Sequence, residues 1–140
     1  MPGTDTIHID GACFCGRVTF EADVDPHAVG ICHCTDCQKL TGTAYRVSVS
    51  APREAFRLTG AAPKLFTKIA ESGRPRYQYF CPDCGSPIYT TGEGPDAERI
   101  GIRWGTISQR AALRPGRRIW NRSAPQWVEQ LAEMPAVPKE

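Results

Sequence analysis

Short stretches in which apolar and polar residues partly alternate recur along most of the chain. They are rich in β-branched and aromatic residues, and this combination is typical of half-buried strands. Glycine and proline, 13 and 12 of the 140 residues, separate the stretches and favour turns between them. We therefore predict a mainly β fold of small antiparallel sheets, with short strands at residues 6–10, 17–24, 44–50, 75–80, 86–91 and 98–104.

Two other stretches have helical patterns. Thr35 is followed three residues later by Gln38, which has the form of a capping box, and Gly42 suits the end of a short helix with Cys37 in its first turn. We expect a second helix at residues 124–134 to cover the core. It carries Pro125 near its start and Trp127, Val128, Leu131 and Met134 at helical spacing.

The length and composition predict one domain, residues 1–140. A chain of 140 residues can bury about two thirds of its unfolded surface, so a core is possible without cross-links. Hydrophobic residues make up 41% and no apolar run approaches the length of a membrane span. The N-terminus, "MPGTDTIHIDG", lacks a basic start and an apolar segment, so we expect a cytoplasmic protein without a membrane partner.

All seven cysteines lie within three residues of another cysteine. Seven cannot all pair within one chain, and clustered cysteines in a reducing compartment are more often metal ligands than disulfides. The clusters are Cys13-x-Cys15, Cys32-x-Cys34-x-x-Cys37 and Cys81-x-x-Cys84.

The formal charge of +2 does not predict a nucleic-acid partner, because it counts every cysteine as neutral. Seven thiolates and two Zn(II) ions would change it to −1, since seven negative and four positive charges are added. Arginine outnumbers lysine 13 to 4, and guanidinium groups suit carboxylates and phosphates. An anionic small ligand fits this composition equally well.

The segment "FCPDCGSPIY" has the form of a zinc knuckle. Pro82 stiffens the turn between Cys81 and Cys84, and Gly85 tolerates a positive φ after the second ligand. Two further thiolates can come from "CFCG", because residues two apart on a strand point to the same face. We predict one closed site of four thiolates from Cys13, Cys15, Cys81 and Cys84.

This partition leaves Cys32, Cys34 and Cys37 for a second Zn(II) with a vacant fourth position. Structural zinc is normally closed by four protein ligands, whereas catalytic zinc keeps one position open. One alternative is a ribbon of Cys34 and Cys37 with Cys81 and Cys84, which leaves three cysteines without partners. Another is a purely structural second zinc, with His33 or a partner chain as the fourth ligand.

The three histidines give weaker signals. His33 alternates away from its cysteine neighbours, so a supporting or solvent-facing role is favoured over ligation. His8 in a strand and His27 in a turn are interpreted as structural. The sequence has no Ser/His/Asp order, phosphate loop or GxGxxG pattern.

The motifs "GACFCGRVTF", "ICHCTDCQKLTG" and "YFCPDCGSPIY", followed by "RIGIRWGTI", resemble the glutathione-dependent formaldehyde-activating enzyme family, whose domain is shared with centromere protein V. The resemblance runs from Ile9 to Met134. It implies a mainly β fold around zinc, with a structural zinc on Cys13, Cys15, Cys81 and Cys84 and a catalytic zinc on Cys32, Cys34 and Cys37.

The resemblance also implies an activity: a carbon–sulfur lyase that condenses formaldehyde with glutathione to S-hydroxymethylglutathione. Arg118 departs from the pattern, since relatives often have histidine there, and this bears on which substrate is used. The partner would be a small thiol, glutathione. Arg46, Arg74, Arg76 and Arg103 flank predicted strands and are candidates to bind its carboxylates.

Other functions remain open from the sequence. A carrier or a lyase for another thiol or thioether would use the same metal sites. A non-catalytic zinc module that binds protein or nucleic acid would need a basic stripe with aromatics, and "ALRPGRRIWNR" is the nearest match. An iron–sulfur protein would need a different cysteine spacing.

Overall fold

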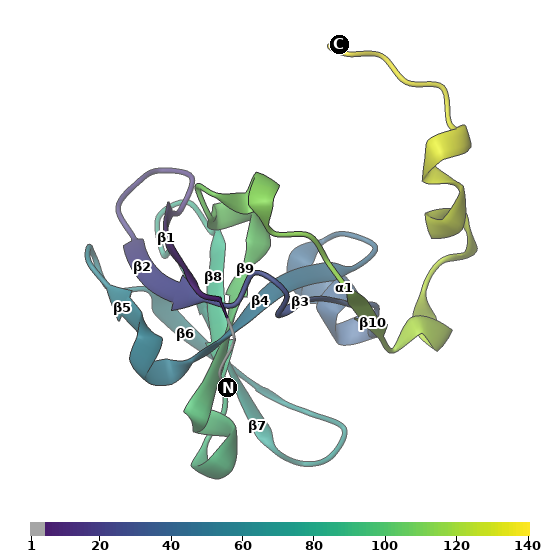
Figure 1. The fold of residues 1–140 in the computed structure, drawn as a ribbon. Helices are drawn as coiled ribbons and strands as arrows, with labels where there is room; N and C mark the ends of the chain where they lie inside the picture. Colours follow the sequence, from purple (N-terminus) through teal and green to yellow (C-terminus); the bar gives the residue numbers. More distant parts are fainter. Residues whose placement is uncertain (1–4) are drawn as a thin grey trace.

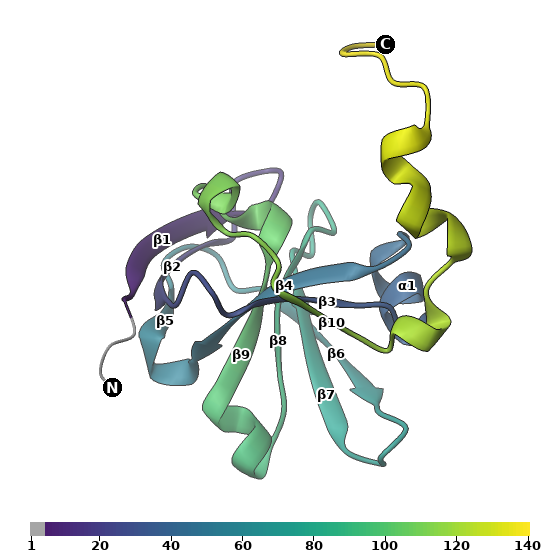
Figure 2. The ribbon, with the colours of Figure 1, turned by 45° about the vertical axis from the view of Figure 1, so that its right-hand side comes forward.

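Two β-sheets form the body of the computed structural model, which describes residues 5–140. The smaller sheet is antiparallel, with strand order β1-β2-β5, and consists of β1 (Ile7–Ala12), β2 (Thr19–Val24) and β5 (Phe56–Leu58). In Figures 1 and 2 it lies to one side of the larger sheet, near the purple start of the chain.

The larger sheet has the strand order β10-β3-β4-β9-β8-β7-β6. All its neighbours are antiparallel except β3 and β10, which run parallel and bring the late chain beside the cysteine motif. The strands are β3 (Val29–Cys32), β4 (Arg46–Pro52), β6 (Lys64–Ile69), β7 (Pro75–Phe80), β8 (Pro87–Thr91), β9 (Arg99–Arg103) and β10 (Arg117–Ile119).

The mainly β prediction is confirmed, and all six predicted strands overlap observed ones. Four strands were not predicted: β3, β5, β6 and β10. Strand β3 is short and runs directly into the cysteine motif, while β5 and β10 have three residues each. Such segments carry too few residues for a period of two to be recognised.

Alternation along the strands separates an apolar core from a polar sheet face. Val49 of β4 and Ile102 of β9 are paired neighbours, are fully buried and belong to the core. The small sheet adds Ile9 and Phe20 to the same core. The alternate residues of β4 and β9, Ser48 and Arg103, lie opposite one another on the other face. The polar face is therefore free to form a site.

One α-helix and several short 3₁₀ segments connect the strands within residues 5–140. The α-helix is α1 (Thr35–Thr41), and Gly42 ends it in the left-handed conformation at φ 68°, as predicted. The 3₁₀ segments are Arg53–Ala55, Gly94–Glu98, Trp104–Thr106, Arg110–Ala112, Asn121–Ser123 and Gln126–Glu133.

The prediction for residues 124–134 was wrong in two respects. The segment is 3₁₀ rather than α-helical, and Gln130 has non-helical backbone angles at a kink. It also does not cover the core, since Trp127 and Leu131 are each 47% exposed. Figures 1 and 2 show this yellow part of the chain running outward from the sheets. The spacing of apolar residues predicted that the segment has an apolar face, but it could not predict whether that face packs against the rest of the protein.

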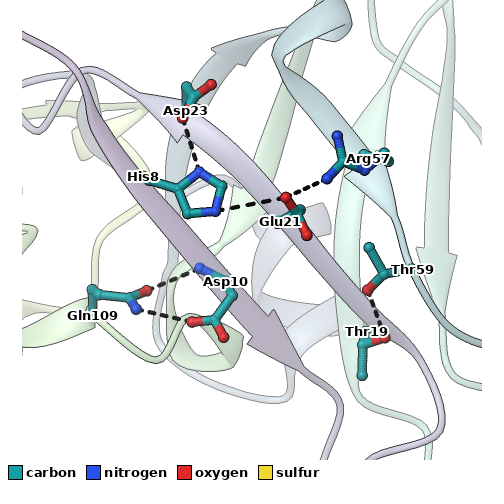
Figure 3. A network of polar contacts seen from close by, with 8 residues as sticks. All are labelled: His8, Asp10, Thr19, Glu21, Asp23, Arg57, Thr59 and Gln109. Atoms are coloured by element: carbon teal, nitrogen blue, oxygen red, sulfur yellow. Dashed lines mark hydrogen bonds and ion pairs between the residues drawn. The ribbon is translucent and has the colours of Figure 1, made fainter.

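A network of polar side chains covers the outer face of the small sheet (Figure 3). His8 contacts Asp23 through Nδ1 at 2.9 Å and Glu21 through Nε2 at 3.6 Å, while Arg57 also pairs with Glu21. The side chain of Gln109 accepts a hydrogen bond from the backbone N–H of Asp10 at 3.0 Å and donates one to Asp10 Oδ1 at 2.9 Å. His8 thus joins neighbouring strands, in line with its structural interpretation.

In the part of the chain that the structure describes, no helix is both long and apolar enough to cross a membrane. Residues 1–4, which begin the stretch considered above for an export signal, lie outside the described residues.

Candidate metal centres and the adjoining cavity

The structure gathers the seven cysteines into two separate groups of thiols. In each group the sulfur atoms all lie within 4.8 Å of one another, so each could hold a metal ion. One group has four members and the other three, which is the division favoured from the sequence. The groups are Cys13, Cys15, Cys81 and Cys84, and Cys32, Cys34 and Cys37.

The four-thiol group is built from two turns. Gly85 adopts φ 79° after Cys84, and its N–H donates to the carbonyl of Cys81, as expected of a knuckle. The prediction that Cys13 and Cys15 lie on a strand was wrong, because β1 ends at Ala12 and a turn follows. Both sulfurs still reach the same site.

The spacing of these sulfur atoms fits a tetrahedral zinc ion. Cys15 Sγ lies 3.6 Å from Cys13 Sγ and 3.7 Å from Cys81 Sγ. Four sulfurs around zinc at about 2.3 Å would be about 3.8 Å apart. Backbone N–H groups of Val18 and Asp83 also donate to the sulfurs of Cys13 and Cys81, which stabilises thiolates.

Ser86 ties the two turns together. Its hydroxyl accepts a hydrogen bond from the backbone N–H of Phe14 at 3.0 Å and lies 3.3 Å from Cys84 Sγ. The hydrogen bond with Ser86 lowers the pKa of Cys84 to about 5. Phe14, between Cys13 and Cys15 in the sequence, is 93% exposed, so its side chain points into solvent and away from the thiol group.

The three-thiol group lies where β3 ends and α1 begins. Cys32 is the last residue of β3, Cys34 is the N-cap of α1, and Cys37 is in the first helical turn. The sequence placed the helix cap at Thr35, but the capping residue is Cys34, one position earlier. Its Sγ accepts a hydrogen bond from the backbone N–H of Cys37 at 3.3 Å. The side chain of Gln38 instead donates to the carbonyls of His33 and Ser123.

Arg46 is the charged neighbour of this group. Its Nε donates to Cys37 Sγ at 3.2 Å, and its Nη1 donates to Ser48 Oγ at 2.8 Å. The hydrogen bond from Cys32 lowers the pKa of Cys37 to about 4, and the positive charge of Arg46 acts in the same direction. Sulfur at this position is therefore held as a thiolate near neutral pH.

His33 is not a member of the three-thiol group. Its side chain is completely buried, which excludes the solvent-facing role that the sequence left open. Nε2 accepts a hydrogen bond from Arg118 Nε at 2.9 Å, and Nδ1 has no hydrogen-bond partner within the described residues. Burial lowers the pKa of His33, and the charge of Arg118 lowers it further.

A cavity of about 700 Å³ opens beside the three-thiol group on the polar face of the larger sheet. Cys32 lines it, and Gly30 and Gly101 contribute no side chains that would fill it. Volumes of this size are typical of small-molecule sites. Four arginines also line it, namely Arg46, Arg76, Arg99 and Arg117, against a single carboxylate, that of Asp96.

Two of the four arginines proposed from the sequence line the cavity, Arg46 and Arg76. Arg74 does not line it and pairs with Asp96 at 3.2 Å on the surface. Arg103, which is 8% exposed, does not line it either and instead lines a second cavity of about 330 Å³ together with Gln78. Burial lowers its pKa to about 9; Arg46 also lowers it, while the thiolates of Cys37 and Cys32 raise it.

Sequence reasoning missed Arg99 and Arg117 as lining residues. Arg99 could have been found, because it alternates with Gly101 and Arg103 along a predicted strand and so shares their face. Arg117 had no such signal, since it reaches the cavity only through the parallel pairing of β10 with β3.

Comparisons with known proteins agree with this architecture. The family model described as glutathione-dependent formaldehyde-activating enzyme matches residues 8–123, most of the chain. No curated protein matches the sequence. A crystal structure of a protein from Rhodobacter sphaeroides has a similar fold, with a TM-score of 0.60 at 18% identity, over 78% of this chain and 98% of that one.

Proposed function

The chain belongs to the glutathione-dependent formaldehyde-activating enzyme family, and on that basis we propose that it is a zinc-dependent carbon–sulfur lyase. Its reaction would be the condensation of formaldehyde with glutathione to S-hydroxymethylglutathione, or a reaction of another glutathione adduct. One observation carries this proposal: a group of only three thiols borders a cavity lined by four arginines.

We assign a structural zinc to Cys13, Cys15, Cys81 and Cys84, and a catalytic zinc to Cys32, Cys34 and Cys37. When bound, the catalytic zinc would keep an incoming thiol deprotonated and hold its sulfur in place. The four-thiol group would instead fasten the turn after β1 to the turn after β7 and so contribute to folding. Because both sheets share one core, we treat residues 1–140 as one domain.

The cavity supplies the charges that a glutathione tail requires. Glutathione carries two carboxylates and one amino group, and guanidinium forks bind carboxylates in a planar, bidentate manner. Arg99 and Arg117 on the cavity wall suit the carboxylates, and Asp96 suits the amino group. The sulfur would then lie beside Cys32, which lines the same cavity. Since glutathione is an abundant cytoplasmic thiol, we place the activity in the cytoplasm.

The bond changes are simple once the thiol is bound. The glutathione sulfur attacks the carbonyl carbon of formaldehyde, the carbonyl oxygen takes up the proton that the thiol lost, and the hemithioacetal leaves. The contribution of the protein would be placement of the two reactants at near-attack distance, which can be worth many orders of magnitude in rate.

Cobalt substitution tests the binding step. Titration of glutathione into the cobalt protein should intensify the sulfur-to-metal charge-transfer band saturably. S-methylglutathione, which has the same carboxylates but no thiol, should bind far more weakly, and the Cys34→Ser variant should not respond. An unchanged spectrum at several millimolar glutathione would contradict the proposal.

Exchange spectroscopy with ¹³C-formaldehyde tests the reaction step. At equilibrium with glutathione, the wild-type protein should accelerate exchange between free formaldehyde and the hemithioacetal, and Cys34→Ser should not. Binding of glutathione without faster exchange would favour the alternative, a carrier or a lyase for another thiol or thioether. Absence of both effects, with both metals bound, would favour a non-catalytic zinc module.

A further inference from the structure

Two guanidinium groups, that of the buried Arg103 and that of the half-buried Arg46, share a single hydroxyl beside the three-thiol group. Ser48 Oγ accepts from Arg46 Nη1 at 2.8 Å and from Arg103 Nη1 at 2.9 Å. The contact follows from the sheet register, because Ser48 of β4 pairs with Arg103 of β9. Arg46 lies two residues before Ser48 and so projects from the same face.

Neither guanidinium has a carboxylate partner among residues 5–140. The other hydrogen bond of Arg103 is with a neutral group, since its Nη2 donates to Gln78 Oε1 at 2.9 Å. Its Nε is buried and has no acceptor in the described part of the chain. Burial of a charge is costly unless an opposite charge lies nearby. The nearby negative group is the thiol cluster, which Arg46 Nε reaches at Cys37 Sγ over 3.2 Å.

The charges of this region do not balance until another anion arrives. Three thiolates on a divalent zinc carry a net charge of −1, whereas Arg46 and Arg103 together carry +2. One more thiolate on the open position brings the sum to zero. A neutral fourth ligand, such as water or an imidazole, leaves one buried positive charge without compensation.

We propose that Arg46 and Arg103, joined through Ser48, make the open position of the three-cysteine site selective for an anionic sulfur ligand over a neutral one. This inference rests on the proposed function, in that it takes the three-cysteine group as a metal site with a vacancy. Arg46 and Arg103 are then positioning and specificity-determining residues for the substrate sulfur rather than binders of the substrate carboxylates.

The test compares two small ligands of the cobalt protein. 2-Mercaptoethanol binds as a thiolate and carries no carboxylate, so it offers no group for Arg76, Arg99 and Arg117 of the cavity wall to bind as a carboxylate, and imidazole binds as a neutral donor. In the Arg103→Met variant, the affinity for 2-mercaptoethanol should fall about ten-fold or more while that for imidazole stays within about two-fold. Arg103→Lys, which keeps the charge, should recover most of the loss.

Two further variants complete the test. Arg46→Gln should give the same selective loss, and it decides the matter if Arg103→Met does not fold. Arg114→Gln is the matched control, because Arg114 is exposed, does not line the cavity, and loses the same charge in the substitution. It should leave the affinity for both ligands unchanged.

The inference is overturned if both ligands lose affinity equally, which would indicate a merely structural role, or if neither variant changes the preference. It is also overturned if the wild-type cobalt protein does not bind 2-mercaptoethanol. If 2-mercaptoethanol binds with the predicted selectivity but glutathione causes no spectral change, the inference stands and the proposed substrate is wrong.

Discussion

Arg118 donates from Nε to Nε2 of His33 at 2.9 Å, and this contact joins β10 to the middle of the cysteine motif. The same guanidinium pairs through Nη1 with Glu129 Oε1 at 2.6 Å. Residues far apart in the sequence are thus connected through one side chain at the base of the outward-running C-terminal segment. Arg118 therefore contacts the cysteine motif directly.

Removal of this side chain should destabilise the protein. In Arg118→Ala the completely buried His33 would have no partner on either ring nitrogen, and an unsatisfied buried polar group costs about 1–3 kcal/mol. Denaturant unfolding measures the loss. The exposed control Arg114→Ala should change stability by less than about 0.5 kcal/mol. Equal stability of the two variants would mean that the Arg118 contact contributes nothing.

The cysteine grouping was predictable because its signals are local. Spacing within each motif identifies ligand pairs, and the requirement for four ligands at a structural site joins Cys81 and Cys84 with one other pair. The polar environment was less predictable. Ser48 and Arg103 meet only because β4 and β9, far apart in the sequence, are neighbours in the sheet. Strand order of this kind depends on tertiary packing, which no single segment specifies.

Substitution of Gly11 should be severely destabilising because a core side chain and a backbone carbonyl both approach its Cα closely. A Cβ there would lie 2.3 Å from both Phe20 Cζ and the carbonyl oxygen of Thr106. Gly11→Ala should therefore reduce the free energy of unfolding by about 2 kcal/mol or more. Gly105→Ala is the matched control, since a Cβ at Gly105 meets nothing within 4 Å. Thermal unfolding of both variants checks the difference, and similar melting temperatures would contradict the close approach.

The two metal sites should respond differently to loss of one ligand. Metal analysis of the wild-type protein should find two zinc ions per chain. Cys34→Ser should keep its fold and lose one ion, because it removes a ligand from the site with three cysteines. Cys84→Ser should lose several kcal/mol of stability, because closed zinc sites contribute to folding directly.

Circular dichroism and metal content together distinguish these outcomes. If Cys34→Ser unfolds as readily as Cys84→Ser, both groups are structural and a separate functional site does not exist. A wild-type content of one ion, or of iron in place of zinc, would contradict the two-site assignment.

Alkaline stability should depend on Tyr89. Burial raises the pKa of its hydroxyl above the ordinary value, and its ring stacks on Tyr79 at 4.5 Å between centroids. As the pH rises, this tyrosine ionises at a lower pH in the unfolded chain than in the folded protein. The contribution of Tyr89 to stability is therefore fully present below about pH 10 and is lost above it. Tyr89→Phe should lose less stability between about pH 9 and about pH 11. Parallel pH profiles for the two proteins would contradict this.

Cadmium-113 NMR tests the central claim, a vacant sulfur position on the three-cysteine site, most directly. The cadmium protein should give two resonances, one from four thiolates and one from three, because the chemical shift depends strongly on the number of sulfur ligands. Added glutathione should move only the second resonance, toward the position typical of four sulfurs, and S-methylglutathione should move neither. Two resonances that both begin at the four-sulfur position, or that do not respond to glutathione, would contradict the account.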